Sequence, residues 1–244
     1  MSVITPMIFV GTMYCGEGDY DECCDSILAQ KGVTLQHNVI ANEPEKVAHN
    51  RLWKSWRDVQ HSGFDMFVKV DADTVLAHSE VFLELWHMIV ANPRITGIQA
   101  PLLDNFTEGY INGLNCFTPR VTFQDTADEL FCDRQVDVGH DVVIKSKDVT
   151  ERLRPAGFHC HLATDTQCFH FGLHRALKGQ NDVIAAVKRA WLRNQDRRRA
   201  LALMGAQCAP LFVAGGFNYA DDRFISAFEG VLRKYDDLLK EIAP

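Results

Sequence analysis

The sequence predicts an α/β fold, with a mostly parallel sheet flanked by helices and a helical C-terminal extension. In the first half of the chain, short apolar runs alternate with segments of helical spacing. This order is typical of a parallel sheet with helices on both faces. Turn-forming residues separate the segments. From Asp182 onwards the pattern is almost entirely helical, which predicts the extension.

The elements of the first half are predicted from periodicity and from the residues that punctuate it. Lys31-Gly32 closes a helical segment. Pro44 suits the first turn of the next helix, and Asn92-Pro93 ends a third. The expected order is strand 7–10, helix 19–30, strand 33–41, helix 44–60, strand 64–70 and helix 81–90. Ligands in such sheets bind at the carboxyl ends of the strands.

The second half is less regular, and the sequence divides into one large domain, residues 1–178, and an extension, residues 179–244. Pro155-Ala156-Gly157 ends one helical segment, and Gly215-Gly216 separates the last two. The expected elements are strand 111–117, helix 141–154, strand 158–163 and helices 182–204 and 221–242.

Composition excludes several classes of protein. The 244 residues are 47% hydrophobic and carry a net charge of −7, which argues against a disordered chain and against an overall basic nucleic-acid footprint. No window approaches the ~18 apolar residues of a membrane span. The N-terminus lacks a secretory signal pattern. Eight cysteines without a CxxC pair are expected to be free thiols in a cytoplasmic protein.

Asp71-Ala72-Asp73 directly follows the apolar run that ends at Val70. Period-2 geometry places the two carboxylates on one side if the strand continues. Carboxylates at a strand end suit Mg²⁺ or Mn²⁺ that also binds phosphate oxygens. The alternative is a polar strand exit in which Asp73 caps the following turn. The sequence therefore predicts a candidate divalent-metal site.

Several further motifs precede this pair in a characteristic order. They are the Ser-Ile-Leu-containing helix Cys23–Gln30, the strand exit Val39–Glu43 and the helix segment Lys46–Arg51. With Asp71-Ala72-Asp73, they resemble the nucleotide-binding half of family-2-type glycosyltransferases, which have the GT-A fold. The resemblance covers about residues 5–175. It implies that residues 1–178 form a nucleotide-sugar-binding and catalytic domain.

The resemblance also implies site residues. The family has an Arg-Asn pair in this helix. Here Asn50 matches the asparagine and His49 stands in place of the arginine, so Arg51 or Lys46 can supply the missing positive charge. Asp71 is expected to contact the ribose of the nucleotide or the water molecules bound to the metal. The residues expected to bind the nucleotide sugar are Thr12, Glu17, Asn42, Glu43, Lys46, Asn50, Arg51, Asp71, His174 and Arg175. The expected metal ligands are Asp71, Asp73 and His170.

Histidines and cysteines gather between His159 and His174. His170 and His174 are one helical turn apart, so metal chemistry alone suggests a zinc site, and ordinary polar or core histidines are the alternative. The resemblance offers a third interpretation, because Gly157, Asp165 and His170 match the family's spacing for a histidine near the diphosphate. A mixed Asp/His site suits Mn²⁺ somewhat better than Mg²⁺.

Inverting glycosyl transfer needs a general base for the acceptor hydroxyl. The family places it in an acidic pair at the start of a helix, and no Glu-Asp pair occurs here. His140-Asp141 is the nearest form, so Asp141 is preferred, and Asp148 is the rival. Either carboxylate can instead serve as a helix cap or first-turn residue.

A basic stretch, residues 188–199, lies in an otherwise acidic protein. Its interleaved apolar residues make it amphipathic, so it either packs on the domain with a solvated outer face or makes weak contact with an anionic surface. The extension as a whole is expected to cover the acceptor side or to mediate formation of a homo-oligomer.

The sequence therefore predicts a metal-dependent glycosyltransferase that uses a nucleoside diphosphate sugar, with UDP-sugar preferred. The acceptor is open: a glycan, a lipid-linked glycan, a protein or a modified nucleobase. One alternative is a nucleotidyltransferase of related fold, but the loop Gly11–Gly18 lacks the Lys or Arg that it would need. The other is a non-catalytic zinc-binding interaction module.

Overall fold

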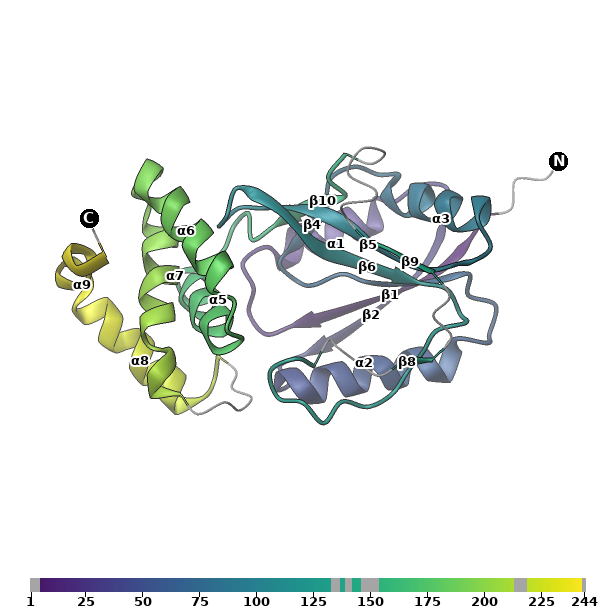
Figure 1. The fold of residues 1–244 in the computed structure, drawn as a ribbon. Helices are drawn as coiled ribbons and strands as arrows, with labels where there is room; N and C mark the ends of the chain where they lie inside the picture. The colour runs from purple at the N-terminus through teal and green to yellow at the C-terminus, as the bar shows by residue number, and fades with distance from the viewer. Residues whose placement is uncertain (1–4, 133–136, 139–141, 146–153, 213–218, 243–244) are drawn as a thin grey trace.

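A computed structural model describes residues 5–132, 137–138, 142–145, 154–212 and 219–242. It is an α/β protein with one large sheet and a separate group of helices beside it (Figure 1). The strands are β1 Met7–Tyr14, β2 Thr34–Ala41, β3 Met66–Lys69, β4 Thr74–Leu76, β5 Ile95–Asp104, β6 Gly109–Phe117, β7 Thr122–Phe123, β8 Asp137–Val138, β9 Val142–Ile144 and β10 Gly157–His159. The helices are α1 Tyr20–Leu28, α2 Glu45–Val59, α3 Val81–Ala91, α5 Asp165–Leu177, α6 Asn181–Asn194, α7 Arg197–Gln207, α8 Asp222–Arg233 and α9 Tyr235–Ile242, with a 3₁₀ turn at Ala209–Leu211.

The large sheet is mixed, so the expectation of a mostly parallel sheet was wrong. Its order is β2-β1-β3-β6-β5-β10-β4, with β9 also beside β5. β1 runs parallel to β2 and β3, but β6 is antiparallel to both β3 and β5. The cause is the hairpin that joins β5 to β6, in which Glu108 takes a left-handed φ of 57°. The strand-like run at 95–104 was not predicted, and β6 returns through the middle of the sheet.

Alternating side chains on the central strands build two cores. Ile8 and Val10 of β1 pack on one face with α1 and α3, while Phe9 points to the other face. On that second face, Leu52 and Trp56 of α2 share one buried stripe, as their spacing predicts. Figure 1 shows α1 and α3 on one side of the sheet and α2 on the other.

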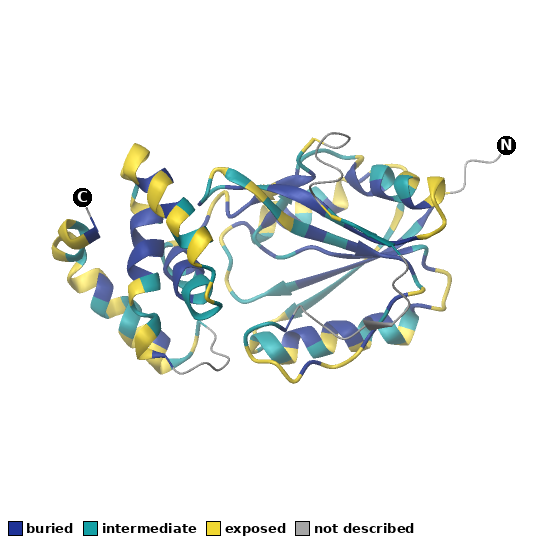
Figure 2. Ribbon diagram, in the orientation of Figure 1, coloured by how far each residue is buried: buried dark blue, intermediate teal, exposed yellow. Residues whose placement is uncertain are grey.

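The C-terminal helices have a core of their own. Buried residues of α5, α7, α8 and α9 form one apolar cluster. Figure 2 shows the buried sides of α5 and α7 facing each other within this helical group. The predicted division at residue 178 thus separates α5 from the helices on which it packs, and it stays a prediction. None of the described helices combines the length and apolar character needed to span a membrane.

Three predicted helices differ from the structure. The single helix expected at 221–242 is two, α8 and α9, with a turn at Lys234 between them. The expected helix 141–154 is wrong at 142–144, which form β9, because Val142, Val143 and Ile144 pair alongside β5. The single helix expected at 182–204 is two helices. Gln195 adopts a left-handed φ of 50°, and the Asp196 side chain then caps α7.

Candidate functional site

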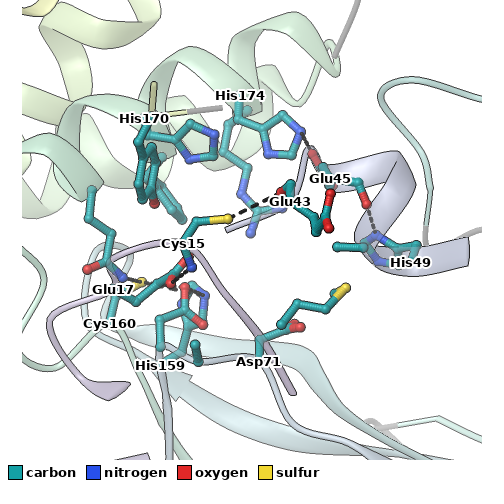
Figure 3. Close-up of a pocket in the computed structure, with 18 of the residues that line it drawn as sticks. Cys15, Glu17, Glu43, Glu45, His49, Asp71, His159, Cys160, His170 and His174 are labelled. Atoms are coloured by element: carbon teal, nitrogen blue, oxygen red, sulfur yellow. Dashed lines mark hydrogen bonds and ion pairs between the residues drawn. The ribbon is translucent and has the colours of Figure 1, made fainter. Parts of the chain in front are cut away.

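A cavity of about 250 Å³ lies where β1 and β3 end, opposite α5 and the start of α2 (Figure 3). Its lining is mainly polar and charged. The residues are Met13, Cys15, Glu17, Glu43, Glu45, Ala48, His49, Lys69, Asp71, Ala72, Asp73, His159, Cys160, Gln167, His170, Phe171, His174, Arg175, Lys178 and Tyr219. This is the strand-end position at which α/β sheets bind ligands. Seven predicted site residues meet here: Glu17, Glu43, Asp71, Asp73, His170, His174 and Arg175.

Asp71 and Asp73 lie in a turn between two strands. β3 ends at Lys69 and β4 begins at Thr74, so the strand does not continue through the pair. The buried Lys69 ammonium lies 2.5 Å from Asp71 Oδ1. Because the Asp71 side chain is 41% exposed, it faces the cavity with its charge already paired.

Asp73 is held from the opposite strand, β10. Its Oδ2 lies 3.4 Å from His159 Nε2 and accepts a hydrogen bond from the Cys160 thiol at 3.3 Å. Its Oδ1 is buried without a hydrogen-bond partner among the described residues. Such an orphaned oxygen costs free energy unless a ligand occupies it. Burial opposes ionisation of Asp73, but the neighbouring His159 imidazole outweighs it and lowers the pKa of this carboxyl.

A second carboxylate orients His159 from behind. Asp104 Oδ1 lies 2.7 Å from His159 Nδ1, with both side chains buried. Burial lowers the pKa of His159, but charge on Cys160 and Asp73 and the Asp104 hydrogen bond raise it well above its ordinary value. A carboxylate on one imidazole nitrogen is the usual support for a metal-binding histidine. It leaves Nε2 directed at Asp73.

These groups fit a divalent metal. The ligand atoms of Asp73, His159 and Cys160 all lie within 4.8 Å of one another, and the orphaned Asp73 oxygen supplies an unused lone pair. Oxygen and imidazole donors suit Mn²⁺, while the thiol suits Zn²⁺. The sequence pattern had singled out the segment His159–Cys160 without assigning either residue a role, because their partners lie 55 and 87 residues away.

The other wall of the cavity belongs to α5. Burial, with smaller contributions from Lys178 and Arg175, lowers the pKa of His170 to about 4. Burial and His170 lower the pKa of His174 well below its ordinary value. Both imidazoles are therefore neutral at pH 7. The His170 ring lies 5.2 Å from that of His174 and 4.9 Å from that of Tyr219.

Glu17 occupies the loop after β1. Its Oε2 accepts the Cys15 backbone N–H at 2.7 Å. Burial raises the pKa of Glu17 to about 7, against the opposing hydrogen bond from Cys15 and with the help of the Asp73 charge. Glu17 is thus a carboxyl that changes charge near neutral pH beside the candidate metal site.

Five other predicted nucleotide contacts do not line the cavity. Thr12 is buried and lies 2.9 Å from His37 Nε2. Asn42, with a left-handed φ of 58°, ends β2 at an exposed position. Asn50 exchanges two hydrogen bonds with the Thr126 backbone.

The two cations that were expected to replace the family's arginine are paired elsewhere. Lys46 forms an ion pair with Glu129, and Arg51 forms one with Glu43. The described cations at the cavity are Lys69, Arg175 and Lys178. Lys69 could have been found from the sequence, because it lies on the predicted strand two residues before Asp71, whereas no sequence pattern pointed to Tyr219.

The two candidate bases, Asp141 and Asp148, lie outside the described residues. Their assignment therefore stays a prediction.

The basic stretch is largely used within the molecule. Arg193 pairs with Glu108, and Arg197 pairs with Asp165. Arg198 donates to a backbone carbonyl, and the buried Arg199 contacts acidic side chains and two carbonyls. Lys188 and Arg189 are exposed. Arg193 and Arg199 therefore hold the helical group to the β5–β6 hairpin, and Arg197 joins α7 to α5.

Comparisons with known proteins give distant likenesses. No protein-family model matches the sequence, and no curated protein matches it. A mannosyltransferase, PcManGT from Pyrobaculum calidifontis in complex with GDP-Man and Mn²⁺, aligns with 98% of this chain and 85% of its own, at 11% identity and a TM-score of 0.43. A197 from STIV aligns with 47% of this chain and 65% of its own, at 10% identity and a TM-score of 0.33. Function is therefore inferred from the site's own residues.

Proposed function

We propose that this protein is a metal-dependent glycosyltransferase of the GT-A type. It moves a sugar from a nucleoside diphosphate sugar, with UDP-sugar as the first donor to test, to an acceptor hydroxyl. The proposal depends chiefly on one observation: Asp71 and Asp73 follow the central strand β3 and line a single cavity whose opposite wall carries the cations Arg175 and Lys178. Carboxylates that hold a metal, opposite cations that hold phosphate, suit a diphosphate leaving group.

Each side chain has a role in this proposal. Asp73 and His159 hold the ion, Asp104 orients His159, and His170 approaches from α5. A bound Mn²⁺ or Mg²⁺ supplies charge that stabilises the departing diphosphate. Asp71 faces the ribose or the metal's waters.

The cations on α5 bind the phosphates. Arg175 and Lys178, three residues apart at the C-terminal end of α5, both line the cavity, so their charges add on one wall. Tyr219 closes the same wall beside His170. In this proposal, these groups orient the diphosphate of the donor between the metal and the cations of α5.

The base remains a proposal on sequence grounds. Asp141 is preferred over Asp148 for removing the acceptor proton, with inversion at the sugar carbon. Asp141→Asn should lower kcat by about 10² or more while donor affinity stays unchanged. If only Asp148→Asn loses turnover, the role passes to Asp148. Full activity in both variants would rule out both residues as the base.

The experiment that tests the function is a thermal-shift screen of nucleotide sugars with and without Mn²⁺. A donor that binds the folded state raises the melting temperature by mass action. We expect a shift that needs both donor and Mn²⁺ and that is lost in Asp73→Asn. The hit is then tested for release of nucleoside diphosphate. No Mn²⁺-dependent shift with any nucleotide sugar would contradict the proposal.

The role of His170 can be tested in the same assay. Loss of the Mn²⁺-dependent shift in His170→Ala, with little change in the melting temperature without ligand, would support His170 as a ligand. A large loss of stability with unchanged nucleotide affinity would identify His170 as a core residue.

The Cys160 thiol favours a second candidate, a zinc-binding module without catalysis, because thiolate is a preferred zinc ligand. Metal analysis of the wild type and of Cys160→Ser distinguishes the two, because the substitution removes the thiol of the Asp73 cluster alone. Tight stoichiometric zinc at Asp73, His159 and Cys160 supports the module, and weakly held, exchangeable Mn²⁺ supports the transferase.

A further inference from the structure

A second group of metal-binding side chains lies at the start of α2. The ligand atoms of Glu45, His49 and Cys132 all lie within 4.8 Å of one another. They come from two places in the chain, the first turns of α2 and the segment that precedes residue 133. None of the three belongs to the Asp73 cluster. A carboxylate, an imidazole and a thiol meet here, each a common zinc ligand.

The position of His49 suits ligation. Its Nδ1 lies 2.9 Å from the Glu45 carbonyl oxygen. A carbonyl only accepts, so Nδ1 carries the hydrogen, and in the neutral ring Nε2 carries the lone pair. A backbone carbonyl on the opposite nitrogen is the usual support of a zinc-bound histidine. The ring is buried, at 3% exposure, so this orientation is held by packing.

Cys132 is also positioned from a second element. It is fully buried, and its thiol donates to the Asp128 carbonyl at 3.2 Å. The segment around it is attached to α2 by the Lys46–Glu129 ion pair and by the hydrogen bonds between Asn50 and Thr126. The thiol therefore reaches the Glu45–His49 face of α2 as part of a well-anchored loop.

α5 brings a fourth side chain of the right chemistry. His174 Nε2 lies 3.3 Å from Glu45 Oε2, as Figure 3 shows. The Lys178 ammonium lies 3.9 Å from the other oxygen, Oε1, so this cation approaches the carboxylate from a different side. Four ligands of a tetrahedral zinc lie roughly 3.5 Å apart. The ligand atoms of Glu45, His49 and Cys132, within 4.8 Å of one another, approach this spacing, and His174 lies beside Glu45.

From these contacts we infer that Glu45, His49 and Cys132 form a second metal site that takes Zn²⁺, with His174 as the fourth ligand. On binding, the Cys132 thiol gives its proton to solvent and its sulfur bonds to the ion. The site joins α2, the loop before residue 133 and α5. Its role is to secure the helical group against the sheet at the edge of the cavity, and it does not depend on the proposed sugar transfer.

Cobalt is a direct probe, because Co²⁺ replaces Zn²⁺ and gives a thiolate charge-transfer absorption. Metal-free Cys160→Ser protein, in which the Asp73 cluster has no thiol, is titrated with CoCl₂. We expect the absorption to saturate at one equivalent, to disappear on addition of Zn²⁺, and to be lost when Cys132→Ser is added. Cys208→Ser, at the partly exposed end of α7, is the matched control and should keep it.

Glu45→Gln provides a variant that retains the thiol and alters a partly exposed side chain. Its Co²⁺ affinity should fall by more than about tenfold, since changes even behind the ligands cost that much. Zn²⁺ should raise the melting temperature of Cys160→Ser protein and not that of the Cys160→Ser, Glu45→Gln protein. Absence of the cobalt–thiolate absorption in Cys160→Ser, or its persistence in the added Cys132→Ser variant, would overturn the site. So would unchanged affinity in Glu45→Gln.

Discussion

Asp73 combines the properties expected of a ligand-binding carboxylate. One of its oxygens contacts His159 and Cys160, and the other is buried without a partner among the described residues. Asp104 adds a second carboxylate behind His159. Buried charges of this kind are stable only when paired, so single substitutions within this cluster test function and stability together.

Asp73→Asn should abolish sugar transfer, with at least about a 10²-fold loss, because the neutral amide is a poor ligand for Mn²⁺. Asn has nearly the same shape, so the far-ultraviolet circular dichroism should not change. Turnover and Mn²⁺-dependent donor binding are measured in parallel. Near-normal turnover in Mn²⁺ would show that Asp73 is not a ligand.

Asp104→Asn should weaken Mn²⁺-dependent donor binding by about 10- to 100-fold through its effect on His159 orientation. A titration of Mn²⁺ at fixed donor measures the change. Asp125→Asn is the comparison, since Asp125 pairs with Arg57 and does not line the cavity. If Asp104→Asn lowers the melting temperature and leaves the Mn²⁺ titration unaltered, Asp104 is structural only.

Glu17 predicts a pH dependence of stability. Its pKa is raised from 4.5 to about 7 in the folded protein, so the folded state binds this proton more tightly than the unfolded state. The stabilising contribution of this group to the free energy of unfolding is therefore fully present below pH 4.5 and is lost as the pH rises through 7. We therefore compare the free energy of unfolding of Glu17→Gln with that of the wild type. The difference should favour the variant by about 1–3 kcal/mol more at pH 8 than at pH 5.

The Glu17→Gln difference is measured by urea unfolding at both pH values in the presence of a chelator. The substitution also alters the hydrogen bond from the Cys15 backbone, but this contribution is the same at both pH values and cancels in the comparison. An equal effect of the substitution at pH 5 and pH 8 would contradict the raised pKa.

At the level of elements, the close approach of α5 and α7 decides how the helical group packs. Gly172 and Gly205 lie where the two helices meet: an added Cβ on Gly172 would fall 1.6 Å from the Ala202 carbonyl oxygen, and one on Gly205 would fall 2.1 Å from that of Phe169. Both contacts are with backbone, so they cannot be relieved by side-chain rotation. Two glycines thus set the spacing of the helices that carry His170 and His174.

Gly172→Ala should therefore destabilise the protein by about 1–3 kcal/mol or more, because the backbones must move apart. Gly230→Ala in α8 is the matched control. Among the described residues, no atom apart from the neighbouring backbone of its own helix lies within 4 Å of its added Cβ, and replacing a helical glycine should stabilise by about 0.5–1 kcal/mol. Chemical unfolding of both variants measures this. A similar effect of the two substitutions would argue against the close helix contact.

The whole molecule consists of a sheet with its covering helices and a helical group joined along the cavity. His159, Lys69 and Asp73 come from the sheet region, whereas His170, His174 and Tyr219 come from the helical group or the segments beside it. Ion pairs such as Arg193–Glu108 hold the two parts together. The site therefore needs both parts in place.

A chain that ends at residue 178 is expected to lose stability, because Phe169 and Leu173 would lose their partners on the C-terminal helices. Removal of that core should give a fragment that binds a hydrophobic dye and unfolds without a sharp transition. Cooperative unfolding of the fragment, with donor binding retained, would instead support residues 1–178 as an independent domain.

The sequence by itself determined the local features of this protein. Apolar periodicity located β1, β2, β3, β6 and the helices α1 to α3, and the carboxylate pair after Val70 identified the edge of the sheet where the cavity lies. These features depend on neighbours in the chain, which a periodic pattern records. His170, with Arg175 after it, was placed near the diphosphate by the family resemblance, from the spacing of Gly157, Asp165 and His170, which is also a local feature of the chain.

Only the tertiary structure decided the pairing of distant segments. β6 enters the sheet antiparallel between β3 and β5, and Asp104, His159 and Asp73 meet although tens of residues separate them. Long-range pairing depends on how whole faces pack and on which buried charges can neutralise one another, and a single sequence carries no local record of either. The same reason explains why Cys132 beside His49 became visible only in the folded chain.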